Sequence, residues 1–153
     1  MDLILWRHAE AFEPGQGQDD LDRPLTPKGE RQAQRMAQWL TRQLPASARV
    51  LVSPAKRTQQ TAAALDRKFK TAPELSPGGT VEALLAVARW PDQREPVLVI
   101  GHQPTLGLTA AYLLSGQAQA WPLRKGALVW LRLRRRAEDD QVLLHAALAP
   151  ESL

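Results

Sequence analysis

The 153-residue sequence contains no cysteine, and this absence limits the chemistry that the chain can perform. Without thiols the chain cannot form a disulfide, use a thiolate nucleophile or offer a thiolate ligand to a metal ion. Any covalent catalysis must therefore use another kind of nucleophile.

Long apolar runs are also absent, since none reaches the roughly 18 residues of a membrane-spanning helix. The first residues, Met1-Asp2-Leu3, lack the basic region of a secretory signal. We therefore expect a cytoplasmic protein with no membrane segment. The chain length and its 44% hydrophobic residues are typical of a globular protein, and they predict one domain over residues 1–153.

Charge of one sign is in small excess, with 20 basic and 16 acidic residues giving a net charge of +4. The densest basic run, at residues 132–136, is followed at once by the acidic residues 138–140. This mixed run is typical of a solvated turn rather than of a surface that follows a phosphate backbone. No interleaved pattern of basic and aromatic residues supports a nucleic-acid partner, and we expect none.

Short apolar runs predict five strands, at residues 3–6, 50–52, 97–100, 128–133 and 142–148. Helical patterns lie between most of them and start at Thr26-Pro27, Ser53-Pro54, Val81 and Pro104. Continuous apolar strands that alternate with helices predict a three-layer α/β/α sandwich with a mostly parallel central sheet. The last two strands have no helix between them, so they predict an antiparallel hairpin at one edge.

Three of these strands are followed by side chains that can bind phosphate. The first runs into Arg7 and His8, the second is followed by Arg57 on the first turn of a helix, and the third by His102. Ligands bind beyond the carboxyl ends of parallel strands, and a guanidinium suits bidentate phosphate recognition. Taken singly, Arg57 could be a surface residue paired with an acid and His102 a helix cap, but their joint position favours one anion site. His145, which has no polar companions, is interpreted as structural.

These residues stand in motifs that resemble those of the histidine phosphatase superfamily, whose fold is also called phosphoglycerate-mutase-like. The motifs are Leu5–His8, Ser53–Thr61 and Gly101–His102. Within the superfamily, the chain looks most like the SixA-type phosphohistidine phosphatases. That similarity lies in the segments Asp22–Gly29, Pro73–Gly78 and Gly101–Pro104. The chain departs from the family pattern at Ala9, where a glycine is usual.

The resemblance implies a phosphatase in which His8 attacks phosphorus, forms a phosphohistidine enzyme and is regenerated by water. It implies that Arg7, Arg57 and His102 hold the phosphoryl oxygens, with no metal ion and no cofactor. A hydrogen-bond acceptor must also fix the tautomer of His8, and the sequence does not name it.

The general acid is a second departure from the family pattern. Larger superfamily members use a glutamate after the second helix, and no residue matches that motif cleanly. Glu74 is the nearest candidate in order along the chain. Glu10, Asp20 and Asp22, in the polar loop before Pro24, are others.

The leaving group offers a way to interpret this departure. Imidazole is a far weaker base than an alkoxide, so phosphohistidine needs less help from an acid. The loops at residues 10–24 and 70–80 are also short, which predicts a shallow site open to a side chain of another protein. We therefore expect the substrate to be phosphohistidine on a protein of the histidine-containing phosphotransfer type, and the phosphatase itself to be a monomer.

Two alternatives remain open. One is a broad small-metabolite phosphomonoesterase of the same superfamily, which would act on sugar phosphates or nucleotides. The other is a non-catalytic module that binds phosphoproteins, which would show neither turnover nor a phosphorylated intermediate.

Overall fold

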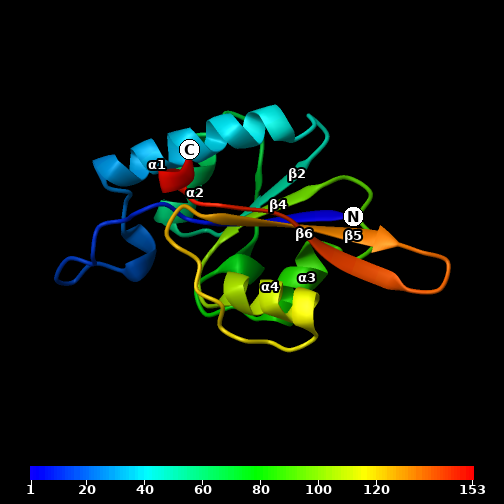
Figure 1. Ribbon diagram of the computed structural model, residues 1–153. Helices are drawn as coiled ribbons and strands as arrows, with labels where there is room; N and C mark the ends of the chain where they lie inside the picture. Colours follow the sequence, from blue (N-terminus) through cyan, green and yellow to red (C-terminus); the bar gives the residue numbers. More distant parts are fainter.

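The computed structural model describes residues 1–153 and is built around a six-stranded sheet with the strand order β3-β2-β4-β1-β5-β6 (Figure 1). The strands are β1 (Asp2–Arg7), β2 (Arg49–Val52), β3 (Lys70–Thr71), β4 (Val97–Gly101), β5 (Leu128–Arg135) and β6 (Asp140–Leu148). The first four are parallel, whereas β5 runs antiparallel to β1 and β6. The mostly parallel sheet with an antiparallel edge hairpin is therefore confirmed.

Helices cover both faces of this sheet (Figure 1). On one face lie α1 (Pro27–Gln43) and α2 (Lys56–Ala63), and on the other α3 (Val81–Val87) and α4 (Thr105–Ser115). Three short 3-10 helices complete the elements, η1 (Asp20–Asp22), η2 (Pro73–Leu75) and η3 (Pro150–Ser152). None of the helices has the length and apolar composition that crossing a membrane would require.

The sheet has a hydrophobic core on each face, and alternate strand residues contribute to each of them. In β1, Ile4 and Trp6 pack with α1 and α2, whereas Leu3 and Leu5 pack with α3 and α4. Successive strand residues point to opposite faces, so a strand that is apolar throughout must be covered on both sides. The predicted three-layer sandwich is confirmed.

Local signals set the start of α1 but not that of α2. The Thr26 side chain accepts a hydrogen bond from the Gly29 amide at 3.0 Å, and Pro27 occupies the first turn. By contrast, α2 begins at Lys56, two residues after Pro54, and its N-cap residue Ala55 makes no side-chain cap. The start expected at Ser53-Pro54 was therefore two residues early. The Ser53 side chain instead contacts His102, the residue that follows β4.

Strand register brings three chain segments to one edge of the sheet. Arg7 of β1 is opposite Gly101 of β4, and the His8 amide donates to the Gly101 carbonyl at 3.2 Å. On the other side of β4, the Ser53 amide donates to the Ile100 carbonyl at 3.1 Å. The residues that follow β1, β2 and β4 are therefore neighbours.

Candidate active site

The four side chains predicted to bind phosphate lie together at this edge. The rings of His8 and His102 have centroids 5.4 Å apart, and Nη2 of Arg57 lies 3.4 Å from Nδ1 of His102. His8, Arg57 and His102 are buried, at 5%, 3% and 4% exposed, and Arg7 is partly buried. We call Arg7, His8, Arg57 and His102 the anion cradle.

Each of the two guanidinium groups donates to a backbone carbonyl and keeps an Nε donor without an acceptor. Nη1 of Arg7 donates to the Leu123 carbonyl at 2.7 Å, and Nη1 of Arg57 donates to the Asp20 carbonyl at 2.8 Å. The Nε groups of both arginines are buried without an acceptor. Burial lowers the pKa of both side chains, and each of them remains a cation at neutral pH. Buried cationic donors without acceptors are costly, and an oxyanion would relieve that cost.

One tautomer of His8 follows from a single contact. Its Nδ1 lies 2.7 Å from the backbone carbonyl of Ala9. A carbonyl oxygen only accepts hydrogen bonds, so Nδ1 must carry the proton. In the neutral ring Nε2 then keeps its lone pair, which is the form that a nucleophile needs. The acceptor that the sequence could not name is the next residue's own carbonyl.

His102 is positioned by groups on both ring nitrogens. Nδ1 faces Nη2 of Arg57, which can only donate, and Nε2 lies 2.8 Å from Oγ of Ser53. The neutral ring therefore accepts at Nδ1 and donates from Nε2 to Ser53. Sequence reasoning missed this role of Ser53 because the Ser-Pro pair is also a common signal for the start of a helix.

Ala9, where the family pattern has glycine, fits its position. Its side chain is fully buried, and its amide donates to Oγ1 of Thr61 at 3.1 Å. Oγ1 of Thr61 in turn donates to the Arg57 carbonyl at 2.8 Å. Thr61 thus ties the segment after His8 to α2, and its place in the Ser53–Thr61 motif has a structural explanation.

Comparison with known proteins identifies the family of this chain. The sequence model of the histidine phosphatase superfamily (branch 1) matches residues 3–78. Phosphohistidine phosphatase SixA from Escherichia coli strain K12 is 34% identical over 125 residues, which cover 76% of each chain. The chain belongs to the histidine phosphatase superfamily.

Solved structures support the assignment over nearly the full length. A protein from Nakamurella multipartitia assigned as phosphohistidine phosphatase SixA superposes with a TM-score of 0.78 at 30% identity, covering 97% of this chain and 95% of its own. A protein histidine phosphatase SixA in complex with tungstate also gives 0.78, at 27% identity and 99% coverage of both chains. The protein is therefore a phosphatase of the histidine type.

The candidate general acids of this histidine phosphatase have different surroundings. Glu74 is exposed in η2, and no hydrogen bond or ion pair joins it to the anion cradle. The Glu10 carboxylate accepts from the Thr26 hydroxyl at 2.7 Å. Asp22 has no side-chain partner, whereas Oδ2 of Asp20 lies 3.1 Å from Nη2 of Arg57. Asp20 is the one acidic side chain that contacts the cradle.

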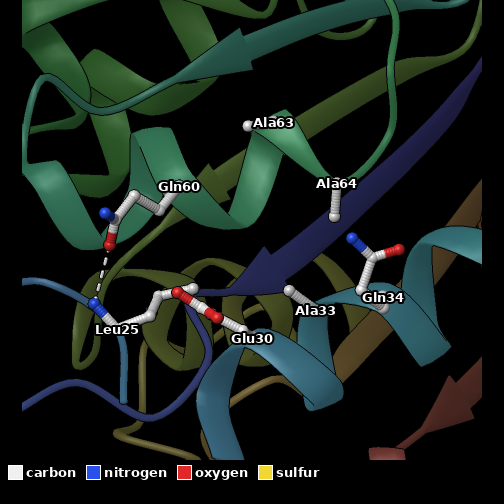
Figure 2. A pocket seen from close by; sticks show the side chains of 7 residues that line it. All are labelled: Leu25, Glu30, Ala33, Gln34, Gln60, Ala63 and Ala64. Atoms are coloured by element: carbon white, nitrogen blue, oxygen red, sulfur yellow. Dashed lines mark hydrogen bonds between the residues drawn. The ribbon is translucent and has the colours of Figure 1, made fainter. Parts of the chain in front are cut away.

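A separate pocket of about 280 Å³ lies between α1 and α2 (Figure 2). Its lining includes Glu30, Gln34 and Gln60, and Oε1 of Gln60 accepts from the Leu25 amide at 2.7 Å. No cradle residue lines it. The hydrogen bond between Gln60 and Leu25 fixes the end of the loop that carries Asp20. The structure brings together no group of three or more histidine and acidic side chains that could hold a metal ion.

We expect His8 to stay neutral across the physiological pH range. Burial lowers the pKa of His8 to about 3, and the nearby His102, Arg57 and Arg7 act in the same direction against the hydrogen bond to Ala9. Because the lowered pKa lies below pH 5, the ring should not gain a proton between pH 8 and pH 5. The ring-proton chemical shift of His8, followed by NMR in phosphate-free buffer, should have no midpoint in that range. A midpoint near the ordinary value of about 6.5 would contradict the prediction.

Proposed function

We propose that the protein removes phosphate from phosphohistidine on a protein substrate of the histidine-containing phosphotransfer type. We propose further that residues 1–153 carry out this reaction as one histidine phosphatase domain. The observation that carries the proposal is the tautomer of His8, which leaves Nε2 with a free lone pair in a site where two guanidinium groups have buried, unpartnered Nε atoms. The relationship to SixA proteins supports it, one of which is described in complex with tungstate, a tetrahedral oxyanion like phosphate.

The proposed reaction has two transfers. In the first, Nε2 of His8 bonds to phosphorus while the bond from phosphorus to the substrate imidazole breaks, and that imidazole keeps the electron pair and takes a proton from solvent. In the second, a water oxygen attacks the phosphohistidine, inorganic phosphate leaves and His8 regains its lone pair. Arg7 and Arg57 hold the non-bridging oxygens and neutralise the charge that spreads over them.

His102 takes part as a donor to the phosphoryl group in this proposal. Its Nδ1 faces Nη2 of Arg57, so donation to a phosphoryl oxygen requires a proton on Nδ1 and the loss of that contact with Nη2. Ser53 allows this change because a hydroxyl can donate to Nε2 as well as accept from it. Burial lowers the pKa of His102 to about 4, with Arg57 acting in the same direction, so the neutral ring can shift tautomer without gaining charge.

The carboxylate beside the cradle favours a leaving group that needs no strong acid. Burial raises the pKa of Asp20, but hydrogen bonds from Arg57 and Arg23 outweigh it and hold this pKa below the ordinary value. A carboxyl held ionised is a poor proton donor. Imidazole, a weak base, departs without strong acid catalysis, whereas a sugar alkoxide does not.

Replacing Glu74 with glutamine should change the rate of hydrolysis of a phosphohistidine protein by less than about threefold, because Glu74 is exposed and contacts no residue of the cradle. Loss of an essential general acid would instead lower the rate roughly a hundredfold or more. The measurement is the steady-state rate at saturating substrate, with Glu82→Gln as a control on another exposed glutamate. A hundredfold loss confined to the Glu74 variant would assign it the acid role instead.

The proposed substrate is tested by direct competition of substrate classes. We expect the catalytic efficiency, kcat/KM, to be higher for a phosphorylated phosphotransfer domain than for small sugar phosphates or nucleotides. Faster hydrolysis of the small phosphates would show a metabolite phosphomonoesterase. Binding of the phosphoprotein without turnover would show a recruitment module.

A further inference from the structure

The outer edge of Arg57 is already occupied by an acidic side chain of the protein. Oδ2 of Asp20 accepts from Nη2 of Arg57 at 3.1 Å, and the same nitrogen lies 3.4 Å from the His102 ring. The Arg57 side chain is 4% exposed and that of Asp20 is 51% exposed. Asp20 therefore lies between solvent and a nitrogen that belongs to the cradle.

The loop that carries Asp20 is fixed by contacts that do not involve this carboxylate. The Thr26 amide donates to the Glu10 carbonyl at 3.0 Å, and a Cβ on Gly29 would come 2.0 Å from the same carbonyl oxygen. Gly29 therefore permits a close approach that another residue would block. Arg57 also holds the backbone carbonyl of Asp20, through Nη1 at 2.8 Å. The Asp20 carboxylate can thus move while the loop stays in place.

A second cation, Arg23, also binds the Asp20 carboxylate. Oδ1 of Asp20 lies 3.0 Å from Nε of Arg23, one turn of η1 away. When Asp20 leaves Nη2 of Arg57, it keeps this partner and is not left as an isolated charge. The cost of displacement is correspondingly small, since the Asp20 side chain is half exposed to solvent.

We propose that the Asp20 carboxylate competes with phosphoryl oxygens for Nη2 of Arg57 and so keeps the affinity of the anion cradle for inorganic phosphate low. Nη2 has two N–H groups, one on the Asp20 carboxylate and one facing His102, so a phosphoryl oxygen that binds the first of them displaces the carboxylate. Repulsion between the two anions acts in the same direction. A phosphoprotein gains further contacts outside the cradle and tolerates this competition, whereas the free phosphate product does not. Asp20 is thereby a specificity-determining residue that favours product release.

Replacement of Asp20 with asparagine tests the proposal by equilibrium binding of inorganic phosphate, measured by isothermal titration calorimetry. We expect the dissociation constant to fall about tenfold, because an ionised competitor is replaced by a neutral one. An unchanged or higher dissociation constant would overturn the proposal, since Asp20 would then merely position Arg57.

Two further variants separate competition from structural effects. Asp20→Glu keeps the charge and should bind phosphate much as the unaltered protein does. Asp22→Asn removes a neighbouring charge that has no partner in the cradle, and it should have little effect. A tenfold gain for Asp22→Asn as well would overturn the proposal by assigning the effect to general charge. The inference rests on the phosphate-binding role of Arg57 within the proposed function, but phosphate binding does not depend on which substrate the enzyme uses. Failure of the phosphohistidine assignment would therefore leave this result interpretable.

Discussion

Replacing His8 with alanine is expected to reduce phosphatase turnover by roughly 10⁴- to 10⁶-fold, the range seen when an enzyme loses its nucleophile. The reason is geometric, since no other ring nitrogen in the cradle is held with a free lone pair. His102 has its Nε2 bound to Ser53 and its Nδ1 facing Arg57. The variant should also form no acid-labile phosphoenzyme when it is mixed with labelled phosphohistidine protein.

The fold should survive this replacement. The hydrogen bond lost is the one to the Ala9 carbonyl, which costs about 1 to 3 kcal/mol if the carbonyl stays buried without a donor. His145→Ala is the matched control, because His145 is exposed on β6 and its ring packs against Trp130. Thermal unfolding followed by circular dichroism should show a cooperative transition for both variants. Turnover by folded His8→Ala within tenfold of the unaltered protein would exclude His8 as the nucleophile.

Replacing Arg57 with alanine is expected to lower turnover by roughly 10³- to 10⁵-fold, as for other arginines that stabilise a transferring phosphoryl group. Arg57 is central because it contacts His102, carries one of the two unpartnered Nε groups and holds the Asp20 carbonyl. Its loss removes a cation from the transition state and also one contact that holds the loop. Both kcat and the affinity for phosphate should fall.

A lysine variant separates charge from shape at this position. Arg57→Lys keeps a cation but loses the planar fork, so it should recover only part of the rate that alanine loses. Arg67→Ala is the control on a partly exposed arginine outside the cradle, whose Nη1 donates to the Pro45 carbonyl. It should leave turnover within about twofold, as expected of a surface substitution. Full activity in the Arg57→Lys variant would mean that charge alone is needed, and full activity in Arg57→Ala would remove this residue from the site.

Much of the fold could be predicted because its strands are buried on both faces. The runs at residues 3–6 and 97–100 are apolar throughout, a pattern typical of central parallel strands. Strand β3 could not be predicted, since its two residues, Lys70 and Thr71, are exposed and show no periodicity. The start of α2 was misplaced because Ser53 contacts His102 in the site and does not cap the helix.

The meeting of the cradle side chains could be anticipated for a related reason. Each lies at or after the carboxyl end of a parallel strand, and register then places His8 beside His102. Contacts made by the backbone and by the loop were beyond the sequence. The Ala9 carbonyl that fixes His8 has no side-chain signature, and Asp20 reaches Arg57 only through the path of the loop between Glu10 and Pro24.

The most direct test is to mix the protein with a phosphotransfer domain carrying ³²P-labelled phosphohistidine, quench within milliseconds under alkaline conditions, and locate the label on the phosphatase. We expect transient labelling of His8 at Nε2, since Nδ1 carries the proton that is donated to the Ala9 carbonyl. Release of labelled phosphate with no labelled His8, or stable label on any other residue, would contradict the proposed nucleophile.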